Sequence, residues 1–306
     1  MSENKKPTSN RRGFLQQMAL LSVASLVTPQ MTQAFTGSSV DKAKLRVLSC
    51  NIRVDLPDDE KVGNGWKTRR EACLQIIKKQ KVDVVGFQEV LVNQFEDLKD
   101  GLADYFGIGF DGPEMDRYKE GYHGIAKNPI FFSKKRFELL TAGGYWLSEN
   151  PLEAGSISWE SARARNAFWV RLRDKKTGKQ FRVVNFHLDH VKEEAKIQQI
   201  QVVLKESAQY QDDFIQIMTG DFNAHPTSKV IADVLEKGWL DSFTGKLEGT
   251  THGFKPQDKE RAARAKKIDY IFSKGPIQAK ESHIIKDNYK GIYPSDHYFL
   301  MAEFEL

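Results

Sequence analysis

Amide, carboxylate and imidazole side chains recur in this chain where runs of apolar residues begin or end. The segments are Ser49-Cys50-Asn51-Ile52, Gln88-Glu89, Asn185-Phe186-His187, Gly220-Asp221-Phe222-Asn223, Ile268-Asp269-Tyr270-Ile271-Phe272 and Ser295-Asp296-His297. Carboxylate and amide oxygens are the ligands that Mg²⁺ prefers, and imidazoles and carboxylates transfer protons. Gathered at one edge of a sheet, these groups would support metal-assisted attack of water on a phosphate ester.

The spacing of two of these residues supports a shared site. Asp221 and Asn223 are two residues apart on an extended segment, so their side chains point to the same side. A lone Gly-Asp-Phe-Asn is more often a turn, because Asp and Asn are favoured there. The tetrapeptide therefore gains its meaning from the other five segments. Asp269 lies between apolar residues, and a buried carboxylate there needs a partner such as a histidine.

Six such segments in this order resemble the endonuclease/exonuclease/phosphatase superfamily, whose members share a DNase I-like fold. The resemblance runs from about Leu45 to Leu306, so we expect one domain over residues 45–306. It implies a four-layer α/β sandwich, in which two packed mixed β-sheets are flanked by helices. It also implies a hydrolase that uses Mg²⁺ or Mn²⁺ and in-line attack of an activated water. The apolar pattern alone indicates only a generic α/β domain.

The resemblance implies a role for each site residue. Glu89 is the principal metal ligand, Asn51 lies beside it, and Asp296 closes the metal site. Asp221 orients or activates the water, Asn223 holds the phosphate, and Asp269 pairs with His297, which contacts the phosphate. His187 stabilises the developing charge or protonates the leaving oxygen.

Three further residues follow from their positions in the sequence. Arg165 precedes a predicted strand, and we expect its guanidinium to contact the substrate phosphate, the alternative being a solvated loop charge. Asp189 shares the side of His187 on an extended segment, so we expect it to line the pocket and contact the phosphate. His190 is expected to face away. For Asp189 and His190, a place on the surface or behind the site is an equal alternative.

Hydrophobic periodicity predicts the elements that must position these residues. Strands are expected at residues 45–52, 82–87, 129–132, 137–147, 167–173, 181–187, 214–218, 268–273, 277–285 and 297–304. Helices are expected at residues 66–80, 92–103 and 192–210, with a short helix opening at Pro226. Residues 107–128 are expected to form a loop over the site. The polar segments thus fall at predicted strand ends.

The charge of the chain leaves its partner open. The sequence carries a formal net charge of +5, but residues 1–34 hold four basic side chains and one acid. The remainder has 42 basic against 40 acidic residues, a net +2, which is too small to indicate nucleic acid. The stretch from Lys255 to Lys267 holds six basic residues and leads into the Asp269 segment, so it should overhang the site. It would grip a polyanion or form a solvated loop, and the absence of interleaved aromatics favours the solvated loop.

The first 34 residues predict a targeting segment. Asn10-Arg11-Arg12-Gly13-Phe14-Leu15 precedes a modestly apolar run that ends at Val27. A twin arginine before such a run is typical of a Tat-type signal peptide, which is followed here by a short linker at residues 35–44. The run is shorter than the roughly 20 residues that a membrane anchor needs. We therefore expect export by the Tat translocase to a bacterial periplasm or the exterior, with no integral membrane segment in the mature form.

The substrate remains open at this stage. The superfamily reading allows a phosphodiester or a phosphomonoester, carried by nucleic acid, a phospholipid head group or a small phosphorylated metabolite. A nuclease is a specific alternative, either a DNA endonuclease or an RNA 3′-exonuclease, and the Asn185–His190 stretch resembles the deadenylase branch, which favours the RNA exonuclease. A non-catalytic binding module on the same fold is a further alternative, although every expected site residue is present.

Overall fold

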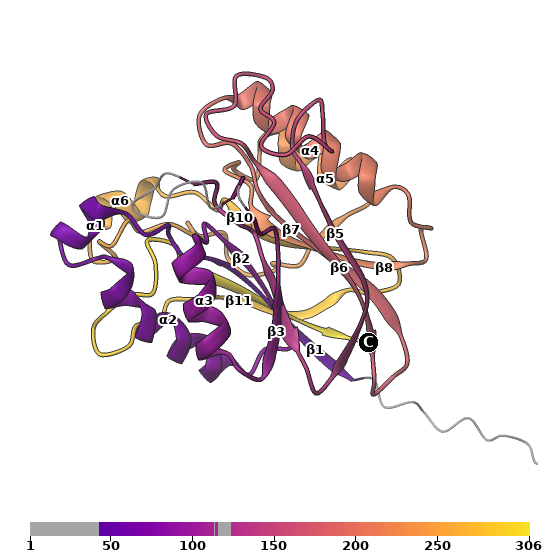
Figure 1. Cartoon of the computed structure of the whole chain (residues 1–306), viewed down its shortest axis with the longest axis horizontal. Helices are drawn as coiled ribbons and strands as arrows, with labels where there is room; N and C mark the ends of the chain where they lie inside the picture. The colour runs from indigo at the N-terminus through magenta and orange to yellow at the C-terminus, as the bar shows by residue number, and fades with distance from the viewer. Residues whose placement is uncertain (1–42, 113, 116–123) are drawn as a thin grey trace, which may run out of the picture. The chain divides into compact units, whose positions relative to one another are not determined.

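The computed structural model describes residues 43–112, 114–115 and 124–306 (Figure 1). The predicted signal peptide, most of the predicted linker and residues 116–123 of the predicted loop lie outside the described residues. Within the described part of the chain, no helix is both long and apolar enough to cross a bilayer.

The described residues form two mixed six-stranded sheets. The order in the first sheet is β11 (Ala279–Ile285), β12 (Phe299–Glu305), β1 (Lys44–Asn51), β2 (Val84–Gln88), β4 (Ile130–Ser133) and β3 (Tyr105–Ile108). The order in the second sheet is β5 (Phe137–Trp146), β6 (Asn166–Asp174), β7 (Gln180–His187), β8 (Ile215–Asp221), β10 (Asp269–Lys274) and β9 (Leu240–Asp241).

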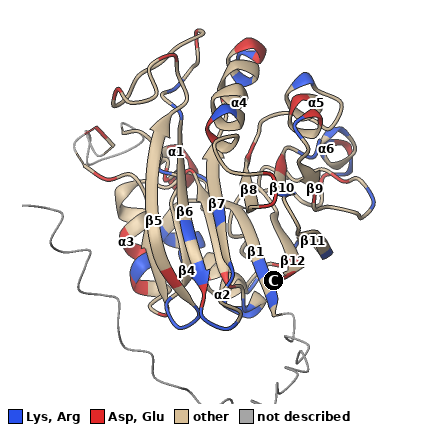
Figure 2. Cartoon of the chain, turned by 90° about the vertical axis from the view of Figure 1, so that its right-hand side faces the viewer, with Lys and Arg blue, Asp and Glu red and all other residues tan. Residues whose placement is uncertain are grey.

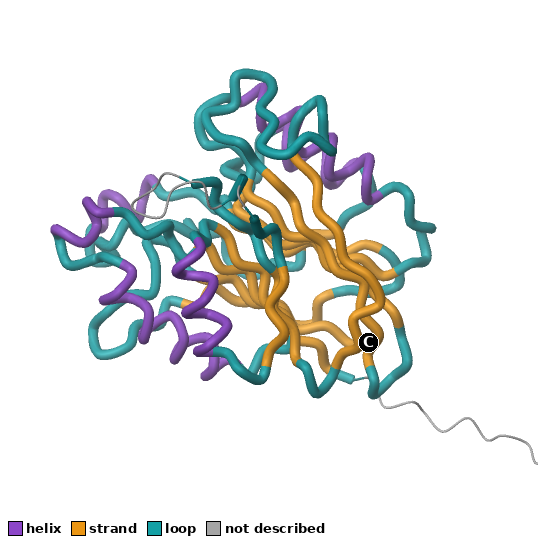
Figure 3. Tube along the Cα trace, in the orientation of Figure 1, coloured by secondary structure: helices purple, strands orange, loops and turns teal. Residues whose placement is uncertain are grey.

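Helices cover the outer face of each sheet (Figure 3). The first sheet is covered by α2 (Trp66–Gln80) and α3 (Val92–Gly101), and the second by α4 (Glu193–Ser207) and α5 (Lys229–Glu236). Two short helices, α1 (Pro57–Lys61) and α6 (Lys259–Arg264), lie in loops.

Three apolar layers join these elements. One lies between the sheets and includes Val47, Val170 and Ile217. The other two lie between a sheet and its helices, around residues such as Phe87 and Phe186. The predicted four-layer α/β sandwich is thereby confirmed.

Strand direction brings the polar segments to one edge. β1 runs parallel to β2, and β7 runs parallel to β8, so each pair ends on the same side. β10 and β12 run antiparallel to β8 and β1 and therefore begin there. In this register Asp221 pairs with His187 on one side and with Asp269 on the other. The expected site residues thus share one edge because of sheet topology.

Buried polar groups join the two sheets beneath this edge. Gln88 Nε2 on β2 donates to Asn185 Oδ1 on β7 at 2.6 Å, and Asn185 Nδ2 donates back to the carbonyl of Phe87 at 2.7 Å. A Cβ atom on Gly86 would meet the hydroxyl of Thr219 and would lie 2.7 Å from Asn185 Oδ1. Glycine at this position therefore permits the close approach of the sheets.

Some predicted boundaries differ from the observed ones. β1 begins at Lys44, inside the predicted linker. α5 begins after Ser228, whose hydroxyl accepts from the backbone N–H of Ile231, and not at Pro226. The serine cap determines this helix start because its hydroxyl satisfies an otherwise unpaired backbone donor. The short strands β3 and β9 were not predicted, since so few residues show no clear periodicity.

Candidate active site

The shared edge of the sheets holds a pocket of about 390 Å³. It is lined by Arg53, Val54, Leu56, Glu89, Arg163, Arg165, His187, His190, Asp221, Asn223 and His297. Three arginines and three histidines therefore face two carboxylates. Such a lining favours an anionic ligand with a cation held between the ligand and the carboxylates.

Asn51 holds the two carboxylates of the pocket together. Its Nδ2 donates to Glu89 Oε1 and to Asp221 Oδ2, each at 3.0 Å. The second oxygen of Glu89 accepts from the backbone N–H of Val54 at 2.9 Å. Neither Glu89 nor Asp221 has an ion pair with a lysine or arginine among the described residues, so both carboxylates are available to a bound cation.

Left-handed backbone occurs at three non-glycine residues of the pocket. The φ angles are 58° at Arg53, 63° at Glu89 and 48° at Asn223. Such conformations cost on the order of 1 kcal/mol or more each and persist where surrounding contacts enforce them. At Asn223 the backbone N–H donates to Asp221 Oδ1 at 2.9 Å, which closes a tight turn after β8. The turn directs both side chains into the pocket.

Asp269, His297 and Asp221 form a buried acid–base group. His297 Nδ1 lies 3.0 Å from Asp269 Oδ2, and His297 Nε2 lies 4.0 Å from Asp221 Oδ2. Burial lowers the pKa of His297, but the charges of Asp269 and Asp221 outweigh burial and raise this pKa well above the ordinary value. Burial and the negative charge of Asp269 raise the pKa of Asp221 to about 7. The group therefore holds an imidazolium beside a carboxylate that titrates near neutral pH.

His187 and Asn223 lie on the other side of Asp221. His187 Nε2 is 2.9 Å from Asn223 Nδ2 and 3.4 Å from Asp221 Oδ2. Burial, followed by the charge of Arg165, lowers the pKa of His187 well below its ordinary value. A neutral ring that accepts the Asn223 amide at Nε2 carries its proton on Nδ1.

Two overlapping groups of side chains have the composition of a divalent-metal site. Candidate ligand atoms of Glu89, His187 and Asp221 lie within 4.8 Å of one another, as do those of Asp221, Asp269 and His297. Glu89 and Asp221 offer the hard oxygens that suit Mg²⁺ or Mn²⁺, and Asn51 holds both of them. The imidazoles of both groups are already engaged, that of His187 by Asn223 and that of His297 by Asp269, so the carboxylates offer the ligand atoms for the expected cation.

Asp296 lies outside both groups. Its carboxylate pairs with Arg53 Nη1 at 3.4 Å and accepts from the hydroxyl of Ser295 at 3.3 Å. In this geometry Asp296 holds an arginine of the pocket. Its predicted place as a direct metal ligand has no support from these contacts.

Arg165 lies at the pocket. Its side chain is buried, lines the pocket, and its Nη2 lies 3.2 Å from His190 Nδ1. Arg163, two residues earlier, lines the pocket as well.

Asp189 lies behind the pocket, which is the alternative left open for it, whereas His190, expected to face away, lines the pocket. Asp189 is fully buried, and its oxygens accept from the backbone N–H groups of Ala162, Val191 and Lys192. His190 instead lines the pocket beside Arg165. The prediction assumed an extended segment, but the chain turns after β7 around the Asp189 carboxylate. A carboxylate saturated by N–H donors and absent from the pocket lining does not fit a contact with substrate phosphate.

Arg53 is a charged pocket residue that the sequence pattern did not indicate. Burial lowers its pKa, but the hydrogen bond to Asp59 and the charge of Asp296 outweigh burial and raise it above the ordinary value. Its Nε donates to Asp59 Oδ2 at 2.8 Å. The signal available in the sequence was its place two residues after Asn51, because a residue just beyond a strand end reaches the same edge.

Known proteins share this sequence pattern and this arrangement. The model of the Endonuclease/Exonuclease/phosphatase family matches residues 48–297. The chain belongs to the endonuclease/exonuclease/phosphatase family. The family hydrolyses phosphate esters, so this member is a hydrolase that acts on phosphate ester bonds. Members of the family generally use divalent metals as cofactors. In this chain, the group formed by Glu89, His187 and Asp221 offers a site for one.

Three relatives within the family illustrate its range. A family protein from Bacteroides vulgatus is 33% identical, with a TM-score of 0.77, over 87% of this chain and 100% of that structure. A mannosyl-6-phosphatase from Bacteroides thetaiotaomicron is 27% identical, with a TM-score of 0.76, over 85% of this chain and 99% of that structure. Nocturnin of Drosophila melanogaster is 25% identical over 279 residues, which cover 79% of this chain and 42% of Nocturnin. The match thus spans less than half of the length of Nocturnin.

Proposed function

We propose that this protein is a divalent-metal-dependent phosphomonoesterase that acts on a small phosphorylated metabolite, with a sugar phosphate as the favoured class. The observation that carries the proposal is the composition of the pocket. Arg53, Arg163 and Arg165 surround it, and no Phe, Tyr or Trp side chain lines it among the described residues. Arginines suit the two charges of a terminal phosphate, whereas strands of nucleic acid are usually held by stacking on aromatic side chains.

Pocket size and similarity support the same class. A volume of about 390 Å³ lies in the range of roughly 300–1,000 Å³ that is common for small-molecule sites. The similarity to the mannosyl-6-phosphatase covers nearly the whole of that structure, and a mannose 6-phosphate is a small phosphomonoester.

The proposed mechanism assigns one task to each side of the pocket. Glu89, positioned by Asn51, would hold Mg²⁺ or Mn²⁺, which supplies Lewis-acid stabilisation of the phosphoryl oxygen when bound. Asp221 orients the attacking water and accepts its proton, and the leaving oxygen takes a proton from solvent. The His297 imidazolium, held by Asp269, and the Asn223 amide stabilise the negative charge that develops on the phosphoryl group. The arginines bind the phosphate before attack.

A nuclease is the second candidate function. The observation that favours it is the basic stretch from Lys255 to Lys267, of which residues 259–264 form α6. A DNA endonuclease or an RNA 3′-exonuclease would use such a surface to hold a polyanion. The similarity to Nocturnin supports this second candidate function.

We also propose that the protein is exported. The twin arginine at Arg11-Arg12 and the apolar run after it support transport by the Tat translocase, with a periplasmic or secreted product. A Tat substrate crosses the membrane folded, which suits an enzyme whose site is assembled from both sheets.

A turnover screen tests the enzymatic proposal. The panel contains mannose 6-phosphate and other sugar phosphates, inositol phosphates, sphingomyelin, a phosphodiester reporter, plasmid DNA and oligo-RNA, each with Mg²⁺, Mn²⁺ or EDTA. We expect a sugar phosphate to give the highest kcat/KM and EDTA to abolish it. Asp221→Ala and His297→Ala should each reduce kcat by at least about 100-fold with the fold retained.

A matched substitution separates metal binding from folding. Glu89→Gln keeps the size of the side chain and should raise the concentration of Mg²⁺ needed for half-maximal activity by at least about tenfold. Unchanged Mg²⁺ activation would remove Glu89 as a ligand. If DNA or RNA is the best substrate in the panel, the result supports the nuclease instead. If the folded protein turns over none of the substrates, the result supports the non-catalytic binding module.

A further inference from the structure

A second cavity, larger than the catalytic pocket, lies beside the segment that carries His297. Its volume is about 620 Å³. It is lined by Pro226, Lys246, Leu247, Glu248, Gly249, Thr251, His252, Lys255, Pro256, Ala262, Ala263, Ala265, Lys266, Lys267, Lys286 and Tyr298. None of these residues lines the catalytic pocket, so the two spaces are separate.

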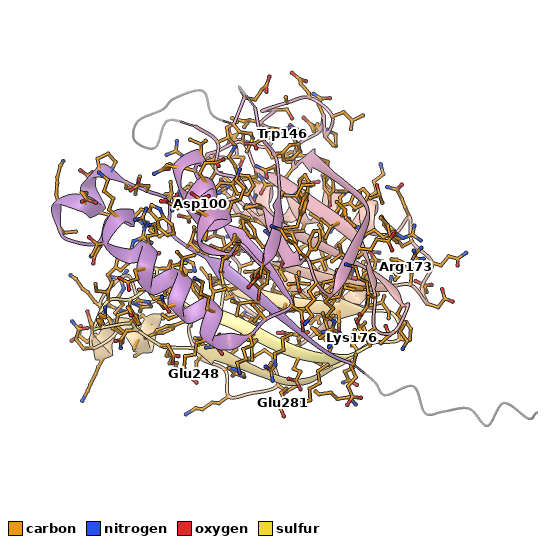
Figure 4. The ribbon with its side chains drawn as sticks, turned by 60° about the horizontal axis from the view of Figure 1, so that its bottom comes forward. Asp100, Trp146, Arg173, Lys176, Glu248 and Glu281 are labelled. Atoms are coloured by element: carbon orange, nitrogen blue, oxygen red, sulfur yellow. The ribbon has the colours of Figure 1, made fainter. Side chains whose placement is uncertain are left out.

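The wall of this cavity carries an excess of positive charge. Five lysines line it against one acid, Glu248, which is labelled in Figure 4. Lys286 pairs with Glu248, and Lys267 pairs with Asp241 at 2.9 Å. The other three lysines have no carboxylate partner among the described residues, and they are Lys246, Lys255 and Lys266. Figure 2 shows further Lys and Arg segments in blue on α6, whose Ala262 and Ala263 line the cavity.

One buried side chain of the cavity wall lacks a hydrogen-bond partner. His252 is 3% exposed, and neither of its ring nitrogens has a partner among the described residues. Its ring stacks on Tyr298 with centroids 4.4 Å apart, so the ring is held in place without a polar contact. Burial lowers the pKa of His252 to about 4, which leaves a neutral ring with one N–H to donate. A buried donor without an acceptor is costly, and an anion in the cavity would supply one.

The cavity is connected to the catalytic site through backbone pairing. Thr251 forms an isolated β-bridge with His297, and the N–H of Tyr298 donates to the carbonyl of Thr250 at 2.8 Å. The N–H of His252 donates to the carbonyl of Asp296 at 2.8 Å. One face of this paired segment thus lines the cavity, while His297 on the same segment lines the catalytic pocket.

From the basic cavity and the unpartnered His252, we propose that this cavity is a second anion-binding site that takes the phosphate group of a small phosphorylated molecule. Lys246, Lys255 and Lys266 provide the charge at its rim, and His252 donates a hydrogen bond from its wall. This site does not depend on the proposed catalytic function, because binding there needs no turnover. The phosphate comes either from free phosphate or from a second phosphorylated molecule, because this cavity and the catalytic pocket are separate.

Lysine labelling measures occupancy of this cavity directly. No lysine lines the catalytic pocket among the described residues, so phosphate bound there does not protect a lysine. The full-length chain is treated with an amine-reactive reagent at increasing inorganic phosphate and constant ionic strength, and each lysine is followed by mass spectrometry. We expect saturable protection of Lys255 and Lys266 by at least about threefold, with Lys135 and Lys237 unchanged.

Two variants identify the groups that bind. Lys255→Ala with Lys266→Ala should weaken the protection of Lys246 by at least about tenfold in phosphate concentration. His252→Phe keeps an aromatic ring against Tyr298 but removes the donor, and it should weaken the same protection. The matched control is Lys135→Ala with Lys237→Ala, which removes two exposed lysines elsewhere. Uniform protection of all lysines, no protection, or equal loss in the control would overturn the proposal.

Kinetics then distinguish the two sources of phosphate. If a second sugar phosphate molecule occupies the cavity, the rate of the native enzyme departs from simple saturation at high sugar monophosphate, and the double lysine variant restores simple saturation. If free phosphate occupies the cavity, it changes kcat of the native enzyme on the monophosphate, and the double lysine variant loses that response. Either kinetic pattern supports the site. The proposal is rejected if neither pattern is seen and the lysines are not protected by phosphate.

Discussion

At the scale of single residues, some side chains line the pocket and others lie behind it and hold the lining side chains in place. Asp269 does not line the pocket, yet its carboxylate sets both the orientation and the charge of His297. Asp189 likewise lies behind the lining and holds the loop from which Arg163 and Arg165 project. The two aspartates therefore act through their neighbours, and substitutions there should change activity without removing a reacting group.

Asp269→Asn should shift the pH dependence of activity. The pKa of His297 is raised in the folded protein, so the protonated ring persists at neutral pH and is lost as the pH rises through that pKa. Removing the charge of Asp269 lowers the pKa of His297, and the alkaline limb of kcat should move to lower pH. The measurement is kcat against pH under saturating metal. An alkaline limb at the same pH in both proteins would show that protonated His297 is not required.

Asp189→Asn should raise KM more than it lowers kcat. The variant keeps the volume but cannot accept all the hydrogen bonds from the Ser161 hydroxyl and from the backbone N–H groups of residues 162, 191 and 192, so the two arginines lose their fixed position. We expect KM to rise by about tenfold and kcat to change by less than about threefold. Asp213→Asn, at an exposed position on the α4–β8 connection, is the matched control. A fall in kcat at constant KM would contradict this positioning role.

At the scale of elements, the site depends on two sheets being held at close distance. β1 and β2 deliver Asn51 and Glu89, whereas β7 and β8 deliver His187 and Asp221. The hydrogen bond between Asn51 and Asp221 joins one sheet to the other across the pocket. The contact between Gln88 and Asn185 does the same below it. Packing between the sheets, more than any single loop, sets the distances in the site.

Gly86→Ala should destabilise the protein at this contact. The added methyl group meets Thr219 and Asn185 between the sheets, and overpacking of this kind costs about 1–3 kcal/mol. The free energy of unfolding is measured with urea. Combining Gly86→Ala with Thr219→Ala removes the hydroxyl that the methyl group meets, so the double variant should recover part of the loss. Strict additivity of the two substitutions would show that the close approach is relieved in another way.

At the scale of the whole molecule, the distribution of charge determines which molecules the enzyme attracts. Residues 35–306 are near neutral overall, but five lysines line the second cavity and three arginines line the catalytic pocket. A nearly neutral surface with local cationic pockets suits capture of small phosphorylated molecules more than non-specific binding to long polyanions.

Export is tested on the full-length chain in bacteria that have or lack the Tat translocase. We expect processed protein in the periplasm or the medium of the first strain and retained precursor in the second. Arg11→Lys with Arg12→Lys should give retained precursor in both, because the twin arginine is the recognition element. Periplasmic protein in the strain without the translocase would contradict the Tat prediction.

The sequence by itself determined which residues stand at strand ends and where the longer helices and strands lie. Helix α2 occupies the predicted residues 66–80, because its buried apolar residues recur at helical spacing. The tertiary structure alone decided what those residues contact. It placed Asp189 behind the pocket and His190 in it, and it brought Arg53 to Asp296 from the opposite end of the sequence. Periodicity reports on the local backbone, whereas these contacts depend on a turn after β7 and on strands joined across hundreds of residues, which no local pattern encodes.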